Sequence, residues 1–237
     1  MINTFLAPFT TFIDYFFPEN TDVKEHSDLI YFDFETTGLN PYHNKIIEYA
    51  FIQEDLQRID SDIPIEDYNL IISDLVNPAT KFSKKITEIT GIHPDEVEDK
   101  KKMNYHICKI MKFINFDMES NNIYLVAHNC DAFDRLFLIN AIKKYNKKNP
   151  SNYIHYKHIE FIDTLNLAKK LLPNLTSYSM KSLAIYFNVT CGTHRATSDT
   201  ICLRKIYHKL IELLEQKINY NKQYIIDNPS VVMDYLY

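Results

Sequence analysis

A short run in which apolar and acidic residues alternate restricts the fold of this chain more than any other feature. Residues 29–35 read Leu-Ile-Tyr-Phe-Asp-Phe-Glu, and β-branched and aromatic residues of this kind favour a strand. Successive side chains of a strand point to opposite faces. Asp33 and Glu35 therefore project from one face, and Phe32 and Phe34 point the other way, into a core.

The rest of the chain predicts an α/β layer fold with a mixed sheet. Further strands are expected at 46–52, 68–72, 123–127 and 158–162, and helices at 83–89, 102–116, 133–145, 164–172, 179–187 and 196–214. Three strands in sequence, followed by strands that alternate with helices, are typical of this class. We expect one domain over residues 28–214, with an N-terminal extension (1–27) and a C-terminal tail (215–237) that the sequence does not place.

The N-terminal extension is apolar and aromatic at helix-like spacing until Pro18. We expect it to pack on the domain as an arm. The alternative is a helix that docks on a partner or a membrane surface, but no Lys or Arg precedes Lys24 to support it. The extension also lacks the basic start of a secretory signal, and no apolar run reaches membrane-spanning length. We therefore expect an intracellular protein, cytoplasmic or nuclear, without membrane contact.

The four cysteines agree with an intracellular location. Cys108, Cys130, Cys191 and Cys202 contain no C-x-x-C pair, which argues against a zinc ribbon or a disulfide framework and favours a reducing compartment. Glycine is scarce, so each of Gly38, Gly91 and Gly192 is expected where the backbone needs special freedom.

The net charge of −5 has the wrong sign for a protein that holds nucleic acid by bulk electrostatics. It suits an enzyme whose acidic site obtains positive charge from metal ions. Basic runs occur at 84–85, 100–102, 143–144 and 147–148, and each one alone is best interpreted as a solvated helix end.

Two more acidic residues stand at the start of predicted helices. Asp134 follows a buried strand and a polar loop, and Asp199 follows a loop that contains His194. Taken singly, each has an ordinary structural explanation, because an acidic residue is favoured in the first turn of a helix. The pair Asp33 and Glu35 would repel each other unless a cation lay between them, and hard oxygen ligands select Mg²⁺ or Mn²⁺ rather than zinc.

Taken together, these segments resemble the three motifs of DEDDh (DnaQ-like) 3′→5′ exonucleases, a family of the RNase H-like superfamily. The first motif resembles residues 32–38, the second His128-Asn129 with Phe133-Asp134, in the spacing of TREX-like members, and the third His194-Arg195-Ala196 with Asp199. The histidine of the third motif marks the DEDDh branch. The similarity covers roughly residues 28–212, most of the chain.

The resemblance implies an RNase H-like fold with a central mixed five-stranded sheet flanked by helices. It implies a catalytic set in which His194 is the general base and four carboxylates bind two Mg²⁺ ions, with Mn²⁺ as a substitute. Those four are Asp33, Glu35, Asp134 and Asp199. Contacts to the substrate are implied for Thr36, Thr37, Gly38, Leu39, Asn129 and Phe133, although Phe133 is equally well a core aromatic. Asp163 is read as a helix cap.

The implied reaction is hydrolysis that releases nucleoside 5′-monophosphates from single-stranded 3′ ends, with DNA the favoured polymer. An RNA 3′-end exonuclease of the oligoribonuclease type would need nearly the same site, because only contacts to the 2′ position separate the two. A third possibility is a catalytically dead fold that only binds nucleic acid. That class is expected to lack at least one of the five catalytic residues, and all five are present here. The oligomeric state is left open.

Overall fold

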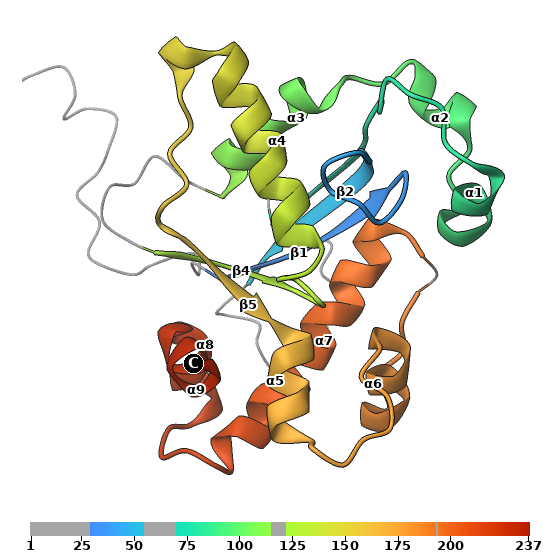
Figure 1. The fold of residues 1–237 in the computed structure, drawn as a ribbon. Helices are drawn as coiled ribbons and strands as arrows, with labels where there is room; N and C mark the ends of the chain where they lie inside the picture. Colours follow the sequence, from blue (N-terminus) through green and yellow to red (C-terminus); the bar gives the residue numbers. More distant parts are fainter. Residues whose placement is uncertain (1–28, 55–69, 115–121, 193) are drawn as a thin grey trace, which may run out of the picture.

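A computed structural model describes residues 29–54, 70–114, 122–192 and 194–237 (Figure 1). The arm expected at residues 1–27 lies outside these ranges. The described residues form five strands: β1 (Leu29–Thr36), β2 (Ile46–Gln53), β3 (Ile71–Leu75), β4 (Ile123–Ala127) and β5 (Ile159–Asp163). None of the helices in the described part of the chain is long and apolar enough to span a membrane.

The strands make one mixed sheet in the order β3-β2-β1-β4-β5. β2 runs antiparallel to both β1 and β3, whereas β4 runs parallel to both β1 and β5. The predicted α/β fold with a mixed five-stranded sheet is thus confirmed. β3 continues three residues beyond the predicted end at residue 72, because its pairing with β2 extends to Leu75 opposite Glu48.

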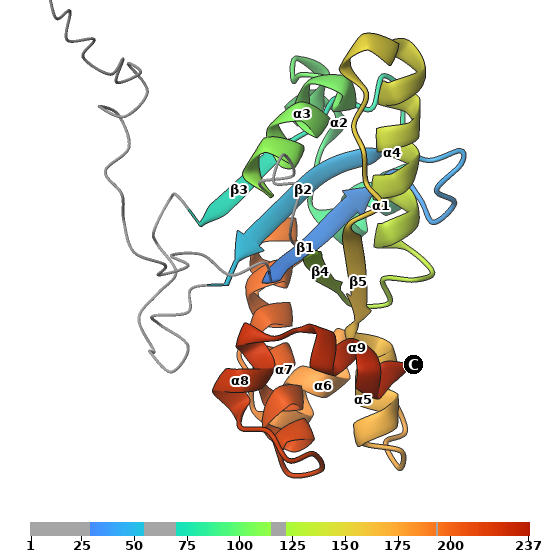
Figure 2. The ribbon, with the colours of Figure 1, turned by 90° about the vertical axis from the view of Figure 1, so that its left-hand side faces the viewer.

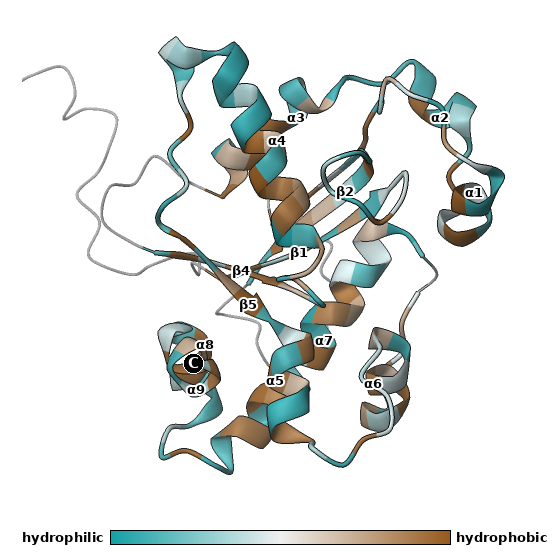
Figure 3. Ribbon diagram, in the orientation of Figure 1, coloured by the Kyte–Doolittle hydropathy of each residue, from teal (hydrophilic) through white to brown (hydrophobic). Residues whose placement is uncertain are grey.

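Helices cover both faces of the sheet (Figure 2). α3 (Met103–Phe113) and α4 (Asp134–Lys148) lie on one face, and α5 (Thr164–Leu171), α6 (Met180–Phe187) and α7 (Ala196–Glu215) lie on the other. Two short helices, α1 (Lys84–Thr90) and α2 (Pro94–Glu98), follow β3, and a 3₁₀ turn (Pro150–Asn152) follows α4. The middle of α4 is hydrophobic where it meets the sheet, whereas its outer end is hydrophilic (Figure 3).

The C-terminal tail folds into two helices, α8 (Lys222–Asp227) and α9 (Ser230–Leu236). Ile225, Ile226 and Val232 are fully buried in the core on the α7 face of the sheet. Each helix is too short for a helical period to be read from the sequence alone, which is why the sequence did not place the tail.

The alternation in β1 divides the two cores. Ile30, Phe32 and Phe34 point into the core under α3 and α4, whereas Leu29 and Tyr31 point into the core under α7. Asp33 and Glu35 continue the second series, so they project on the α7 side of the sheet.

A buried ionic cluster fastens α7 to the sheet. Glu54, which directly follows β2, is fully buried and accepts hydrogen bonds from Arg204 Nε (3.0 Å), His208 Nε2 (2.7 Å) and the Tyr31 hydroxyl. Burial by itself raises the pKa of Glu54, but the hydrogen bonds and positive charges of His208 and Arg204 outweigh it and lower that pKa to about 2. The carboxylate therefore stays ionised inside the protein.

Replacing Glu54 by Gln should lower the free energy of unfolding by about 3 kcal/mol, because it removes the buried negative charge to which Arg204 and His208 donate. Urea denaturation at pH 7 measures the change. The carboxylate's contribution is fully present above its unfolded pKa of 4.5 and is lost as pH falls toward about 2. The difference between variant and parent should therefore shrink below pH 4.5.

Glu88→Gln is the matched control, because its ion pair with Lys84 is exposed and such pairs add little stability. Equal stability of Glu54→Gln and the parent at pH 7 would contradict the role given to this cluster.

Candidate functional site

The site lies where β1 extends beyond the end of β4, the strand that runs parallel to it. β1 pairs with β4 only through Leu29, Ile30 and Tyr31, and β4 ends at Ala127. The second half of β1 therefore extends past the carboxyl end of β4, where the loop that leads into α4 begins. Asp33 and Glu35 occupy this extension, at the edge of a sheet where α/β folds commonly place their ligands.

Three carboxylates meet at this edge. Asp33 and Glu35 come from β1 and Asp199 from the first turn of α7, and each offers one oxygen that lies within 4.8 Å of the other two. All three are partly exposed. Residues more than 160 positions apart in the sequence are brought together because α7 packs across β1 and β2.

Asp134 lies behind this group. It opens α4, is 2% exposed, and accepts a hydrogen bond from the Phe34 backbone N–H at 3.2 Å. Burial, and then the negative charge of the nearby Asp33, raise the pKa of Asp134. The structure therefore gathers all four predicted acidic residues, with three forming the tight group and Asp134 held alongside by the backbone of β1.

His194 stands in the loop that leads into α7 and is exposed. Burial raises the pKa of the Asp199 carboxyl, and the neighbouring His194 opposes this effect. Gly192 lets this loop lie against α7, because a Cβ at that position would come within 2.5 Å of the Ser198 Cβ. Glycine is therefore required at position 192 because the loop backbone passes close to the Ser198 side chain.

The same loop is tied to α7 by a disulfide between Cys191 and Cys202. This pair departs from the sequence prediction, which argued against a disulfide framework and favoured a reducing compartment, whereas Cys108 and Cys130 are free. The eleven-residue separation is not a paired-cysteine motif. The two sulfurs meet because the loop turns back over the start of α7, and the spacing in the sequence does not show this reversal.

An ion pair that the sequence analysis missed joins the loop to the sheet. Glu48 on β2 is 5% exposed and lies directly opposite Glu35. It accepts three hydrogen bonds from the Arg195 guanidinium (Nε at 2.9 and 3.1 Å, Nη2 at 2.6 Å) and one from the Ala196 N–H (2.9 Å). An acidic residue inside the otherwise apolar run 46–52 was the available signal. The pair holds the first residues of α7 against β2.

The surroundings of the site disfavour the ionised form of its own carboxyl groups. Burial, then the charges of Asp199 and Glu48, raise the pKa of Asp33 to about 8. Burial, then Asp33, Asp199 and Glu48, raise the pKa of Glu35 to about 9, and Arg195 opposes this. Burial raises the pKa of Asp199 as well. A cation at this position would relieve the repulsion, and a set of oxygen donors suits a hard divalent metal.

The predicted substrate contacts of the β1–β2 loop lie beside the carboxylates. Thr36 is buried, and its hydroxyl donates to the Gly38 carbonyl at 2.8 Å. The Thr37 N–H donates to the Lys45 carbonyl at 2.8 Å. Gly38 has φ +152, and a Cβ there would meet Asn44 at 2.8 Å. Leu39 is 82% exposed, so its side chain is available to a ligand.

The other two predicted contacts lie in the loop before α4. Asn129 is exposed and adopts φ +60. Phe133 is partly buried against the core, with its ring 4.9 Å from that of Phe137. Asp163 caps α5, as expected, by accepting from the Leu165 N–H at 2.9 Å, and it also accepts from the Asp131 N–H. It therefore shapes this loop without joining the carboxylate group.

Comparison with known proteins agrees with this geometry. The RNase_T family model, described as Exonuclease, matches residues 30–207. A "DNA polymerase III PolC-type" from Thermotoga petrophila is 29% identical over 89% of the chain, and "Exonuclease DPD1, chloroplastic/mitochondrial" from Arabidopsis thaliana is 29% identical over 81%. The chain spans 14% and 58% of the length of these two relatives.

Solved structures of exonuclease I have the same fold. One of these structures superposes with a TM-score of 0.60 at 17% identity, and the match covers 78% of this chain and 40% of the exonuclease I chain. It is described as "The structure of exonuclease I suggests how processivity is achieved". E. coli exonuclease I in complex with a dA16 oligonucleotide gives 0.59 at 18% identity, over 78% of this chain and 40% of its own. The predicted RNase H-like fold is thus confirmed.

Mg²⁺ should stabilise the protein more at pH 9 than at pH 6. Asp33 and Glu35 ionise near 3.8 and 4.5 in the unfolded chain and near 8 and 9 when folded without metal. The folded state thus holds more protons, so stability falls as pH rises from about 4 to about 9. A bound cation restores it, and thermal melts with and without Mg²⁺ measure the rise in Tm at each pH.

Asp199→Asn should reduce the Mg²⁺-dependent rise in Tm, whereas Asp99→Asn, at an exposed ion pair outside the site, should leave it unchanged. The same rise at both pH values, or no effect of Asp199→Asn, would count against a metal at these carboxylates.

Arg195→Ala should lower Tm. It should also raise the Mg²⁺ concentration at which half of the maximal Mg²⁺-dependent rise in Tm is reached. It leaves the buried Glu48 without its partner beside three other carboxyls. Adding Glu48→Gln to the same chain should recover part of the loss, because the amide carries no charge. A double-mutant cycle on Tm and on the Mg²⁺ midpoint measures the coupling.

Lys209→Ala, which breaks the half-exposed pair with Glu212 on α7, serves as the control and should change neither quantity. Strictly additive effects of Arg195→Ala and Glu48→Gln would show that the two side chains act independently.

Proposed function

The chain belongs to the exonuclease family, and on that basis we propose that it is a metal-dependent 3′→5′ exonuclease. It would release nucleoside 5′-monophosphates from single-stranded 3′ ends, with DNA as the favoured polymer. The observation that carries the proposal is the meeting of Asp33, Glu35 and Asp199 at the end of β1, within 4.8 Å of one another. A binding module would have no need for so repulsive a group of carboxyls.

The proposed metal ligands are Asp33, Glu35, Asp134 and Asp199, and Mg²⁺ is the proposed ion, with Mn²⁺ as a substitute. Two divalent ions at such a site supply a water of lowered pKa and stabilise charge on the leaving oxygen. The chain supplies the positions of the ligands: β1 fixes Asp33 and Glu35, the Phe34 N–H orients Asp134, and the Glu48–Arg195 pair holds the start of α7.

His194 is the proposed general base. An imidazole titrates near neutral pH and can accept a proton from the attacking water. Its exposed position next to Asp199 leaves room for the substrate end, and the disulfide and the Glu48–Arg195 pair restrain the loop that carries it.

The proposed substrate contacts come from two loops. Leu39 would pack against the terminal base, and Gly38 would let the strand approach the backbone closely. Asn129 and Phe133 would contact the terminal nucleotide from the opposite loop, and Thr36 and Thr37 would shape the loop that carries Leu39. The oligonucleotide bound to E. coli exonuclease I supports a single-stranded DNA substrate. The Arabidopsis relative is described as organellar, and a cytoplasmic or nuclear location for this chain stays a prediction.

His194→Ala should lower the rate of strand shortening by about 2 to 4 orders of magnitude, because it removes the proposed general base. The assay uses 5′-labelled single-stranded DNA and RNA of equal sequence with Mg²⁺. A ladder that shortens from the 3′ end and is lost with EDTA and in Asp199→Ala is the expected result. The polymer that shortens faster identifies the substrate.

His155→Ala, at an exposed histidine, is the control and should shorten DNA at the parent rate. Absence of shortening of both polymers in Mg²⁺ and in Mn²⁺ would favour a module that only binds nucleic acid. Normal turnover in His194→Ala would remove that residue from the catalytic set.

A further inference from the structure

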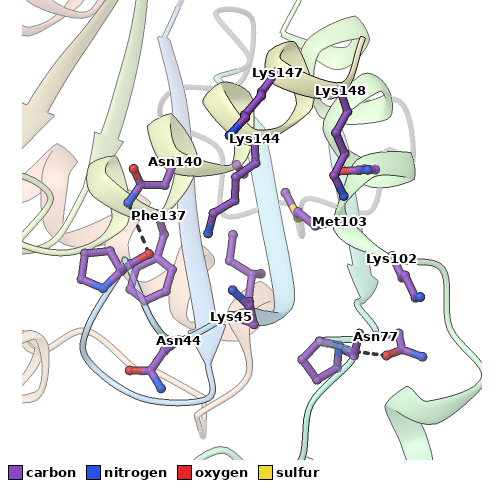
Figure 4. Close-up of a pocket in the computed structure, with 16 residues that line it drawn as sticks. Asn44, Lys45, Asn77, Lys102, Met103, Phe137, Asn140, Lys144, Lys147 and Lys148 are labelled. Atoms are coloured by element: carbon purple, nitrogen blue, oxygen red, sulfur yellow. Dashed lines mark hydrogen bonds between the residues drawn. The ribbon is translucent and has the colours of Figure 1, made fainter.

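A cavity of about 530 Å³ lies along α4, and none of the four site carboxylates lines it. Its walls are α4, the end of the β1–β2 loop, the segment after β3 and the start of α3 (Figure 4). Five of its sixteen lining residues are lysines, and none is Asp or Glu. They are Lys45, Lys102, Lys144, Lys147 and Lys148.

Four of these lysines come from sequence runs that each looked like an ordinary solvated helix end, and Lys45 stands alone in the β1–β2 loop. The fold brings them around one hollow, with Lys144 reaching from α4 toward Lys45 (Figure 4). Partial burial, and then the charge of Lys45, lower the pKa of Lys144. No salt bridge to a carboxylate holds any of the five within the described residues. In a chain of net charge −5, this is a concentrated positive surface with apolar walls from Met103 and Ala141.

The cavity is joined to the candidate active site by one loop and one helix. Asn140, in the cavity wall, donates to the Pro41 carbonyl at 3.2 Å and so ties α4 to the β1–β2 loop. The same loop begins at Thr37, two residues after Glu35, and the Lys45 backbone closes it through two hydrogen bonds with Thr37. Lys144 follows Asp134 by ten residues of α4, about 15 Å at 1.5 Å per residue.

We propose that this cavity, the lysine pocket, binds the phosphodiester backbone of the substrate strand upstream of the 3′ end held at the carboxylates. This inference rests on the proposed function. In a duplex, one strand carries a phosphate about every 3.4 Å, and the phosphates of a single strand are spaced no more closely than this. About four phosphates at most would therefore span the separation of about 15 Å between Asp134 and Lys144. Lysine contacts to phosphates act without regard to base sequence, so the pocket would increase affinity for long strands of any sequence.

The test compares two double variants with the same change in net charge. Lys144→Glu with Lys148→Glu alters the pocket, whereas Lys143→Glu with Lys181→Glu alters exposed lysines that do not line it. Each is assayed on a labelled 20-mer, on a dinucleotide, and on the p-nitrophenyl ester of thymidine monophosphate. The pocket variant should raise KM for the 20-mer about tenfold and leave the dinucleotide and the ester unchanged, because neither reaches the pocket.

Binding is measured separately in an Asp199→Ala background, which leaves the strand intact, by fluorescence anisotropy of the 20-mer as DNA and as RNA. The slope of log Kd against log salt concentration should fall by about 1.4 in the pocket variant, at about 0.7 per lost phosphate contact. If the parent cleaves no substrate but the pocket variant still loses 20-mer affinity, the proposed reaction fails and the binding site stands.

Equal 20-mer affinity and KM in the two double variants would overturn the proposal. So would an unchanged 20-mer affinity together with weakened binding of an oligo-glutamate peptide, since that result assigns the pocket to an acidic protein partner.

Discussion

The repulsion among carboxyl groups at the end of β1 is the constraint on which the rest of the site depends. Asp33, Glu35 and Asp199 crowd within 4.8 Å, with Asp134 and Glu48 close by. The surrounding structure reduces the cost of that crowding. α4 and α7 both direct their N-termini at the group, with Asp134 and Asp199 in their first turns, where the helix dipole favours negative charge. Arg195 adds a full positive charge.

α7 is the element that turns this constraint into a defined geometry. It is fastened to the β2 side of the sheet at two places, by Glu48 with Arg195 at its start and by Glu54 with Arg204 and His208 farther along. The Glu54 carboxylate of the second cluster is fully buried and is not one of the site carboxylates. Because both attachments fix the same helix, Asp199 and the His194 loop are held in place even though their own surroundings are repulsive.

Charge in this protein is separated within a slightly acidic chain. The carboxylates gather at the end of β1 and favour a cation, whereas lysines from three segments gather along the outer half of α4 and favour an anion. The proposed substrate strand would suit both regions, because metal ions at its 3′ end would meet the carboxylates and its anionic phosphates would meet the lysines. The net charge of −5 averages over the two regions and so describes neither.

The sequence by itself determined the strand 29–35, its two-faced pattern and the order of the acidic motifs, because those depend on local alternation and spacing. It also indicated the α/β class and the capping role of Asp163. Only the tertiary structure decided that Glu48 pairs with Arg195, that Cys191 meets Cys202, that residues 215–237 pack as helices, and that scattered lysines share one cavity. Each of these depends on segments that meet through packing of the sheet and its helices, and no local pattern encodes such a meeting.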